Sequence, residues 1–537
     1  MPLLTIRMDE GDRHVPFTEG LSLRALLDQT DLPVRSGCNG MGACGLCRVR
    51  IDGGSVNAPT ENEKVQLSNH QLEAGNRLAC QVKPEQDLEI SLLNPTPKAN
   101  WLCLPDPKER RMAPLDDVSL KVLPGKLKRP YGVAVDLGTT HINVSVFDLS
   151  DGRRLAGRYG LNPQMKFGSD VMTRLVAASE NPENAREISL KAIEGIGDAL
   201  FDISSREGIN LGQVVHVVLA GNTAMLALLA ERNYRLLLKP EHWMGPIDCL
   251  PENNSDWADR WGIHTEARID VIPPLGGFVG SDLLTGVLAT RLNEKKPGSL
   301  FIDFGTNSEI ALWDGRVLRV TSAAGGPAFE GSAISCGVPA GPGAIFNVTL
   351  TDNGTLHYSV LADSAVRGIC GSGMVDLVAV LLKLKKISKT GRFMGALGTG
   401  DFLIEKNGQS LRLTKKDVDL FQQAKAAVGA GIRILMKKAN MKVGDLQRIC
   451  ISGAFGNFLN VKNAQDMGLL PKTHADLVEL CGNTALAGCV HILFSSAGTK
   501  ALQEVRGQAE LINLSRCPDF EDRFLESLYL SPMEATS

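Results

Sequence analysis

Short apolar runs that alternate with polar residues dominate the first 92 residues and predict a small sheet. Leu23, Leu26 and Leu27 lie at helical spacing between two of these runs, and Ser22 stands in position to cap the helix N-terminus. The expected strands are at residues 3–8, 14–17, 48–51 and 88–92. The pattern therefore indicates a mixed sheet packed by one helix.

A different pattern begins near residue 131, where apolar strands alternate with helical segments, as in α/β proteins. Residues 132–149 and 299–312 each read as two strands joined by a tight turn. The two turns match closely, Val-Asp-Leu-Gly-Thr-Thr against Ile-Asp-Phe-Gly-Thr-Asn, and their aspartates lie 167 residues apart (303 minus 136). This internal repeat predicts two related lobes, each opened by one copy.

Residues 94–130, between the two patterns, contain seven prolines and reverse the sign of the charge. They carry 8 Lys/Arg against 4 Asp/Glu, a formal +4, whereas residues 1–93 carry 9 against 13, a formal −4. Because proline cannot continue a helix or a central strand, we expect a semi-extended basic linker here. The expected first domain, linker and two lobes are residues 1–93, 94–130, 131–298 and 299–537.

Composition excludes several classes of protein. The 537 residues, with 43% hydrophobic and 22% charged residues, suit a globular protein with more than one core. The net charge of −3 gives no general attraction to nucleic acid. No apolar run approaches the length of a membrane span, and the N-terminus lacks the pattern of a signal peptide. We therefore expect a cytoplasmic protein with no nucleic-acid or membrane partner.

Four cysteines near the N-terminus, Cys38, Cys44, Cys47 and Cys80, have the spacing of iron–sulfur ligands. Three of them share a glycine-rich loop, which lets the backbone wrap a compact inorganic core and point N–H groups at it. A structural zinc site is the alternative, although zinc sites usually show two separated cysteine pairs. We therefore predict a [2Fe–2S] cluster. The sheet, the helix and the cysteine loop resemble the β-grasp ferredoxin domain, an α+β fold.

Twelve cysteines would suit disulfides only in an oxidising compartment, and nothing in the sequence points to export. Eight of the twelve lie outside the cluster motif, and we expect most of them to be thiols in the core. They are Cys103, Cys249, Cys336, Cys370, Cys450, Cys481, Cys489 and Cys517.

The duplicated Asp-x-Gly-Thr turn is the strongest candidate for a nucleotide site, since the chain lacks both the P-loop and the complete Rossmann fingerprint. Glycine in such a turn allows close approach to phosphate, and the turn N–H and threonine hydroxyl groups donate hydrogen bonds to it. An aspartate at the end of a buried strand can hold Mg²⁺ through water. The candidate residues are Asp136, Gly138, Thr139, Thr140, Asp303, Gly305, Thr306 and Asn307.

An apolar strand at residues 448–452 leads into a third glycine turn at residues 453–456. The three turns together resemble those of the actin, sugar kinase and Hsp70 superfamily, in which the first two hold phosphate and the third contacts adenosine. The resemblance implies a two-lobed, actin-like α/β ATPase with ribonuclease H-like lobes, and it assigns Gly453, Ala454 and Gly456 to adenosine. Taken alone, the third turn would be an ordinary strand-to-helix turn. The expected connections between the lobes are residues 217–225 and 368–373.

A ferredoxin followed by a proline-rich linker and an actin-like ATPase resembles the reductive activators of corrinoid proteins along essentially the whole chain. Residues 273–282 and 325–331 are also similar to segments of that family. The resemblance implies that ATP drives an electron from a [2Fe–2S] cluster to a corrinoid cobalt in the inactive Co(II) state, which restores Co(I). It also implies Mg²⁺, a corrinoid protein of a methyltransferase system, an upstream low-potential electron donor and, as is common in the superfamily, a homodimer.

The same resemblance implies roles for individual residues. Asp136 and Asp303 would be the catalytic residues that position Mg²⁺ and the attacking water, and the remaining turn residues would hold phosphate. Asp282 and Glu330 are candidates for the catalytic cleft or the face that contacts the partner, and each could equally be a helix cap or a surface carboxylate.

Three other functions are compatible with the same modules. A small-molecule kinase of this fold would need a substrate base and a substrate pocket, which the sequence does not identify. A nucleotide-dependent switch would keep the cluster only as a structural element. An electron-transfer subunit with a degenerate ATPase would have no need of the intact turns at Asp136 and Asp303.

Overall fold

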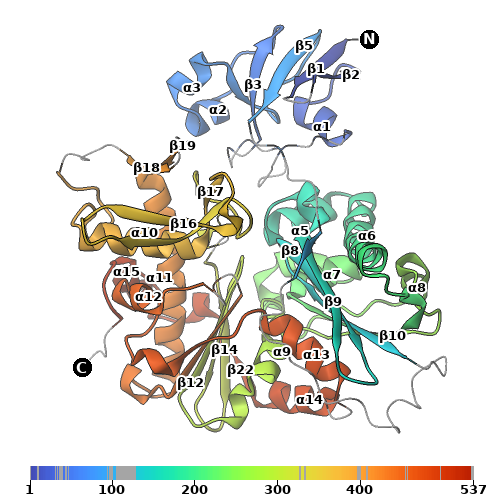
Figure 1. Cartoon of the computed structure of the whole chain (residues 1–537), viewed down its shortest axis with the longest axis vertical. Coiled ribbons are helices and arrows are strands. Elements are labelled where there is room, and N and C mark those ends of the chain that lie inside the picture. The colour runs from blue at the N-terminus through green and yellow to red at the C-terminus, as the bar shows by residue number, and fades with distance from the viewer. Residues whose placement is uncertain are drawn as a thin grey trace.

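The computed structural model of the chain describes residues 2–8, 11–30, 47–93, 101–104, 129–325, 334–395, 401–406, 409–453, 458–495 and 498–533, with single residues 32, 34, 40, 42, 45, 95, 328, 329, 331 and 455. Three larger sheets follow one another along the sequence, the first at the top of Figure 1 and the other two side by side below it. Among these residues, no helix combines the length and the apolar character that crossing a bilayer requires.

The N-terminal part folds into a mixed sheet with three short helices. Across the sheet the strands are β2 (Arg13–Pro16), β1 (Leu3–Arg7), β5 (Leu88–Leu92), β3 (Arg48–Gly53) and β4 (Asn76–Leu78), and the helices are α1 (Leu23–Asp28), α2 (Glu61–Gln66) and α3 (Asn69–Glu73). β1 pairs parallel with β5 and antiparallel with β2, as in the β-grasp fold. The Ser22 hydroxyl accepts a hydrogen bond from the N–H of Ala25, so α1 begins at the predicted cap. The sequence pattern did not predict β4, α2 or α3.

The first lobe of the larger region is a six-stranded sheet covered by helices. In order across the sheet its strands are β11 (Arg268–Val271), β10 (Val214–Gly221), β7 (Tyr131–Leu137), β8 (His141–Asp148), β9 (Arg154–Leu161) and β6 (Leu102–Cys103), and its helices are α5 (Val171–Glu180), α6 (Pro182–Glu207), α7 (Thr223–Leu229) and α8 (Ser255–Trp261). β7, β8 and β9 form an antiparallel meander, and β10 and β11 extend it in parallel from β7. The predicted strand–turn–strand unit is therefore β7–β8.

The second lobe repeats this topology. The strands of its six-stranded sheet are, in order, β21 (Val478–Leu480), β20 (Arg448–Gly453), β12 (Ser299–Phe304), β13 (Ser308–Trp313), β14 (Leu318–Ala323) and β22 (Ala509–Leu511). β12, β13 and β14 form the antiparallel meander, and β20 and β21 extend it in parallel from β12. The two sheets thus share their order and their strand directions over five strands, which confirms the pair of related lobes.

Further elements pack on the second lobe. A three-stranded sheet and a two-stranded ribbon extend it, and a long helix runs through its core. The strands are β15 (Ala344–Leu350), β16 (Leu356–Val360), β17 (Gly368–Ile369), β18 (Phe402–Lys406) and β19 (Gln409–Leu413), and the helices are α10 (Gly371–Lys383), α11 (Lys415–Lys438), α12 (Val461–Asp466) and α15 (Phe520–Leu528). The helix α14 (Gly498–Gln508) instead packs on the two helices that lie between the lobes.

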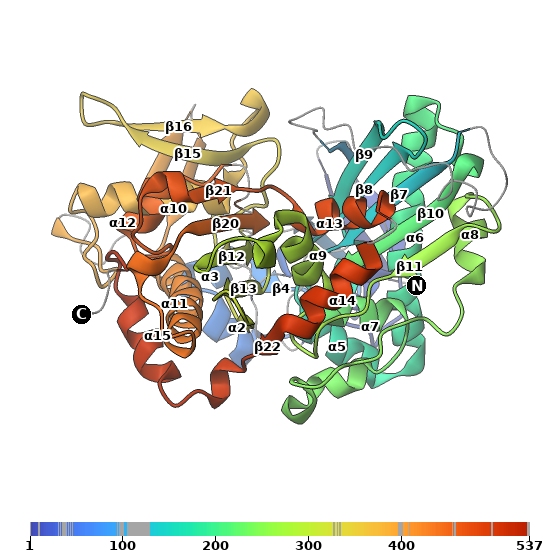
Figure 2. The ribbon, with the colours of Figure 1, turned by 90° about the horizontal axis from the view of Figure 1, so that it is seen from below.

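Two helices lie between the lobes and pack against each other, α9 (Ser281–Thr290) and α13 (Thr484–Leu493) (Figure 2). α9 contacts β10 of the first lobe and β12 of the second, and α13, which follows β21, packs on β7 and β10. Their apolar faces belong to one core that joins the two sheets. The chain passes between the lobes at these helices.

The predicted connections at residues 217–225 and 368–373 are wrong. The first lies in β10 and α7 of the first lobe, and the second lies in β17 and α10 of the second. Their glycines serve close packing instead, because a Cβ at Gly221 would stand 2.6 Å from the carbonyl oxygen of Leu137. A Cβ at Gly371 would stand 2.0 Å from the carbonyl oxygen of Phe329.

Part of the proline-rich segment belongs to the first lobe. β6 pairs antiparallel with β9 at the edge of the sheet, and Trp101 beside it is buried. A Cβ at Gly160 would lie 2.6 Å from the Trp101 ring, so this glycine makes room for the indole. Helix α1 of the N-terminal part contacts the same lobe through Arg24, whose guanidinium donates to the carbonyl oxygen of Lys166 at 3.5 Å.

Candidate functional site

A cavity of about 310 Å³ lies between the two lobes, where β7 and β12 end. Both duplicated turns and the start of the third line it, although they come from distant parts of the sequence. The predicted residues in its lining are Asp136, Gly138, Thr139, Thr140, Asp303, Gly305, Thr306, Asn307 and Gly453. Asp282 lines it as well. Of the other candidates, Ala454, Gly456 and Glu330 lie outside the described residues.

The first turn is braced by side chains of its own lobe. The N–H of Gly138 donates to the carbonyl oxygen of His141 at 2.9 Å, and a Cβ on this glycine would lie 2.6 Å from the same oxygen. Arg174, which is fully buried, donates to the carbonyl oxygen of Thr139 at 2.7 Å. Asn222 donates to the Thr139 hydroxyl at 2.8 Å. The turn is therefore held in a fixed shape before any ligand binds.

Gly453, at the end of β20, lies directly against Asp303 of the second turn. Gly453 has a φ of +75°, and a Cβ there would lie 2.2 Å from Oδ1 of Asp303. Only glycine fits this position without moving the Asp303 carboxylate. The two duplicated turns also touch each other, because the hydroxyl oxygens of Thr140 and Thr306 are 3.5 Å apart.

Four carboxyl groups line the cavity: Asp136, Asp282, Asp303 and Glu309. Burial raises the pKa of Asp282 to about 7, and the charge of Asp136 adds to the rise. Burial also raises the pKa of Asp136 to about 6, against the lowering effect of two amide donors. The pKa of Glu309 lies well above its ordinary value because of burial and the charges of Asp282 and Asp303. A bound cation would favour the ionised forms of all four groups.

Sequence reasoning missed several residues that shape this cavity. Asn143 and Asn483 both donate to Oδ2 of Asp136, at 3.0 and 2.6 Å. Asn143 stands opposite Asp136 in the β7–β8 ladder, and Glu309 stands opposite Asp303 in β12–β13. Counting residues across each predicted hairpin would have found Asn143 and Glu309. Asn483 caps α13, and no local pattern links it to Asp136.

The cysteine loop lies far from this cavity in the sequence. The Sγ atoms of Cys47 and Cys80 lie 3.4 Å apart, while the other two predicted ligands, Cys38 and Cys44, lie outside the described residues. Three glycines of the loop have φ values of +89°, +75° and +69°, which L-residues rarely adopt. They are Gly40, Gly42 and Gly45. Converging thiols on a glycine loop fit a [2Fe–2S] cluster.

Polar contacts hold the described half of this ligand set in place. Arg77 and Glu63 form a buried pair, and Glu63 also accepts from the N–H of Leu78, two residues before Cys80. The Gln81 amide nitrogen lies 3.6 Å from Sγ of Cys80, and its oxygen accepts from the Thr60 hydroxyl at 3.1 Å. Thr60 thereby orients the amide so that its N–H groups point toward the thiol.

Three parts of the chain match known protein families. Residues 6–85 match the 2Fe-2S iron-sulfur cluster binding domain. Residues 131–295 match the RACo middle region, and residues 298–537 match the C-terminal domain of RACo, the ASKHA domain. The N-terminal match supports the cluster, and the C-terminal match supports nucleotide binding.

Individual relatives span most of the chain. It is 33% identical over 427 residues to the corrinoid activation enzyme RamQ of Eubacterium limosum, covering 74% of this chain and 70% of that protein. It is 27% identical over 398 residues to the [Co(II) methylated amine-specific corrinoid protein] reductase of Methanosarcina barkeri, covering 66% and 68%. A solved structure, "Reductive activator for corrinoid,iron-sulfur protein", superposes over 99% of both chains with a TM-score of 0.68 and 25% identity.

Proposed function

Because the chain belongs to the family of reductive activators of corrinoid proteins, we propose that it uses ATP to transfer an electron from its [2Fe–2S] cluster to the Co(II) corrinoid of a methyltransferase-system protein, restoring Co(I). The observation that carries this proposal is the inter-lobe cavity. Both Asp-x-Gly-Thr turns line it, in a chain whose N-terminal sheet brings Cys47 and Cys80 into contact. An ATPase and an electron centre in one chain suit a reaction that couples the two.

Different residues of the cavity bind the phosphates and the adenosine of ATP. The N–H groups and hydroxyls of Thr139, Thr140 and Thr306 donate to phosphate oxygens, as do the backbone groups at Gly138 and Gly305. Gly453, with the neighbouring Ala454 and Gly456, lies against the adenosine, and Asn307 assists at the phosphates. Mg²⁺, when bound, would neutralise charge on the phosphates. Asp136 and Asp303 would hold the Mg²⁺ ion and orient the attacking water.

Asp282 is placed to take part in the hydrolysis step. A carboxyl group acts as a general base only when it is ionised, and a cation bound beside Asp282 would lower its raised pKa and favour that form. Asp282 lines the same cavity as Asp136 and Asp303. We assign it to accepting the proton of the water that Asp136 and Asp303 orient.

The N-terminal part supplies the electron. Cys38, Cys44, Cys47 and Cys80 would hold the cluster, which would supply one-electron transfer. The Gln81 amide lies beside the Cys80 sulfur, where a hydrogen bond stabilises negative charge on the reduced centre. We propose that the domain of residues 1–93 moves between its electron donor and the corrinoid, while residues 102–103 of the predicted 94–130 linker stay paired with β9 of the first lobe.

ATP is needed because Co(I) lies uphill from an ordinary ferredoxin. For one electron, about 59 mV corresponds to a tenfold change in the equilibrium constant. Nucleotide binding can supply the free energy for this uphill electron transfer only by favouring one state of the complex between the chain and its corrinoid partner. The two lobes share the core formed by α9 and α13, so closure over ATP is the element we assign to this coupling.

We also propose the partners of the chain, its oligomeric state and its location. The partners are a corrinoid protein and an upstream low-potential electron donor, and the chain works as a homodimer. The ten cysteines among the described residues carry no disulfide, which suits the reducing cytoplasm.

The test is an anaerobic absorbance spectrum of a corrinoid protein mixed with this chain and a reductant, with and without Mg-ATP. We expect the Co(I) band to grow only when Mg-ATP is present. Unchanged cobalt with several corrinoid partners, while ATP is consumed, would overturn the proposal. A phosphorylated small molecule in that mixture would instead identify a kinase.

Two variants separate the modules. Cys47→Ala should abolish the cluster spectrum and electron transfer while ATP still binds. Asp303→Asn should abolish ATP hydrolysis while the cluster spectrum is unchanged. Loss of both properties in both variants would contradict the two-module account.

A further inference from the structure

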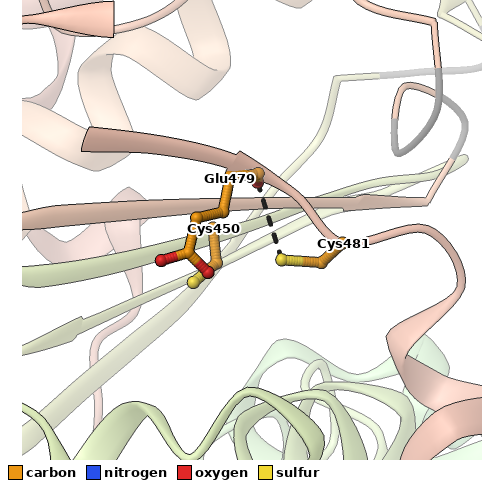
Figure 3. Close-up of side chains that lie close together, drawn as sticks. All are labelled: Cys450, Glu479 and Cys481. Atoms are coloured by element: carbon orange, nitrogen blue, oxygen red, sulfur yellow. Dashed lines mark hydrogen bonds between the residues drawn. The ribbon is translucent and has the colours of Figure 1, made fainter. Parts of the chain in front are cut away.

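A second group of sulfur and carboxylate side chains lies in the other half of the molecule, away from the cluster loop. Cys450 is in β20, Glu479 is in β21, and Cys481 follows β21 directly (Figure 3). Their two Sγ atoms and a carboxylate oxygen all lie within 4.8 Å of one another. Cys450 is fully buried, Cys481 is partly exposed and about half of the Glu479 side chain is exposed. The group therefore has a closed inner side and an opening to solvent.

Strand register explains why these side chains meet. Cys450 stands directly opposite Glu479 in the parallel ladder, and Cys481 extends the ladder by donating its N–H to the carbonyl oxygen of Ile451 at 2.8 Å. Residues two apart on a strand share a face, so Cys481 lies on the same face as Glu479. The arrangement is a product of the sheet and needs no distortion of the backbone.

The three ligand atoms have a separation that suits a shared ion. The two Sγ atoms and a carboxylate oxygen of Glu479 all lie within 4.8 Å of one another, and neither thiol forms a disulfide. Ligand atoms around tetrahedral zinc, at about 2.3 Å for sulfur and 2.0 Å for oxygen, are separated by slightly less than 4 Å. One zinc ion therefore suits the spacing of these three side chains.

Arg448 completes the charge balance. Its guanidinium donates to both carboxylate oxygens of Glu479, at 2.8 and 2.7 Å, and to the carbonyl oxygen of Thr290. Each carboxylate oxygen has a second lone pair, so Glu479 can accept these bonds and still bind a metal. Two thiolates and one carboxylate carry three negative charges, which a divalent ion and one arginine neutralise. The arginine would thus orient a ligand in the way that partners of metal ligands do.

We propose that Cys450, Glu479 and Cys481 bind a Zn²⁺ ion that is separate from the iron of the N-terminal cluster. Binding releases the two thiol protons to solvent, and the open side of Glu479 leaves the fourth position to water. The ion fixes β20 to β21 where both lead into the nucleotide cavity. Gly453 comes three residues after Cys450, and Asn483, which donates to Asp136, comes two residues after Cys481.

The test is the metal content of the whole chain with its cluster intact, after anaerobic equilibration with Zn²⁺ and removal of loosely held metal. We expect one zinc per chain beside the two irons of the cluster in the unchanged protein. Cys481→Ser should lose that zinc, and Glu479→Gln should lower its occupancy. Cys517→Ser alters another partly buried thiol outside the group and should keep it. The iron content must stay the same in all four proteins, which excludes zinc bound in place of the cluster.

Three results would overturn the proposal. The first is no zinc in the unchanged protein, and the second is the same zinc content in Cys481→Ser as in Cys517→Ser. The third is a peptide cross-linked through Cys450 and Cys481 in the protein as isolated, since that would show a disulfide. If Cys481→Ser failed to fold, the surface change Glu479→Gln and the zinc count of the unchanged protein would still decide. The zinc count does not depend on corrinoid reduction, so it can fail or succeed independently of the proposed function.

Discussion

The two lobes carry the same turn but place different side chains opposite it. In the first lobe the residue across the ladder from Asp136 is Asn143, and in the second the residue across from Asp303 is Glu309. Asn143 donates a hydrogen bond to Asp136, whereas Glu309 adds a carboxyl group beside Asp303. This one difference at equivalent positions gives Asp136 an amide donor, whereas it gives Asp303 a second carboxyl group beside it.

The glycines that close the two turns are equivalent as well. Gly221 pairs with Leu137 at the end of β10, and Gly453 pairs with Phe304 at the end of β20. A Cβ would strike the carbonyl oxygen of that partner in both cases, at 2.6 Å for Gly221 and 2.3 Å for Gly453. Only Gly453 also faces a carboxylate, that of Asp303. The duplication therefore preserved the backbone and let the side chains diverge toward different roles.

After the loss of hydrolysis expected for Asp303→Asn, the largest effect comes from removing the carboxyl group of Glu309, which stands opposite Asp303 in the β12–β13 ladder. Glu309→Gln should lower kcat for ATP hydrolysis about 10²–10³-fold, because one preorganised charge near the cation is lost. Steady-state ATPase assays measure this, with the cluster spectrum as a check on folding. Ser322→Ala is the matched control, since Ser322 only donates to Glu309 at 3.3 Å. Equal losses in the two variants would contradict a direct role for the carboxyl group.

A second pair of substitutions compares Gly453 with Gly221, the glycines that lie against the two turns. Gly453→Ala should destabilise the protein by about 2 kcal/mol and abolish nucleotide binding, because its φ is left-handed and its Cβ meets Asp303. Gly221→Ala should destabilise the protein but disturb nucleotide binding less. Denaturant unfolding and ATP titration measure the two effects. Gly444→Ala, where nothing lies within 4 Å of the added Cβ, should change neither.

Placing a carboxyl group opposite Asp136, as Glu309 stands opposite Asp303, should weaken the binding of ATP. Asn143→Asp replaces a donor to Asp136 with a second carboxyl group, and we expect a loss of about 1–2 kcal/mol in ATP affinity, roughly tenfold. Calorimetric titration with Mg-ATP measures this. Asn143→Ala removes the donor without adding charge and should lose less. An affinity for Asn143→Asp equal to that of the unchanged protein would show that the two turns are interchangeable.

The smallest expected effect is a pH dependence that the acidic cluster imposes on stability. The folded-state pKa values of Asp136 and Asp282, about 6 and about 7, lie above the ordinary 3.8. The folded protein therefore keeps protons that the unfolded chain has released, so this contribution is present at low pH and is lost as pH rises from about 4 to about 7.

Asp282→Asn removes part of that dependence. We expect the decline in Tm of the nucleotide-free protein between about pH 5 and about pH 7.5 to shrink by about 3 °C, the shift that about 1 kcal/mol produces in a domain of a few hundred residues. Thermal unfolding at several pH values measures it. A Tm profile for Asp282→Asn that parallels the unchanged protein would show that Asp282 titrates normally.

The local sequence pattern predicted the turns that line the inter-lobe cavity and part of the N-terminal fold. The β7–β8 and β12–β13 hairpins follow from apolar runs around a glycine turn, and the residues of those turns line the cavity as expected. α1 and its Ser22 cap likewise follow from helical spacing and a hydroxyl at the right position. The prediction that residues 217–225 and 368–373 connect the lobes was wrong. In the sequence, a glycine at a strand end gives the same pattern whether the chain crosses to the other lobe there or only packs closely against a neighbouring strand.

The sequence by itself determined the two duplicated glycine turns, because a turn's conformation and hydrogen-bonding groups depend on neighbouring residues. It also determined that two copies exist, and hence two lobes. Only the tertiary structure decided what stands around Asp136: Asn483 is 347 residues away and reaches it because α13 crosses from the second lobe. The same holds for Cys450 and Cys481, since strand pairing brings them together and no motif in the sequence links them.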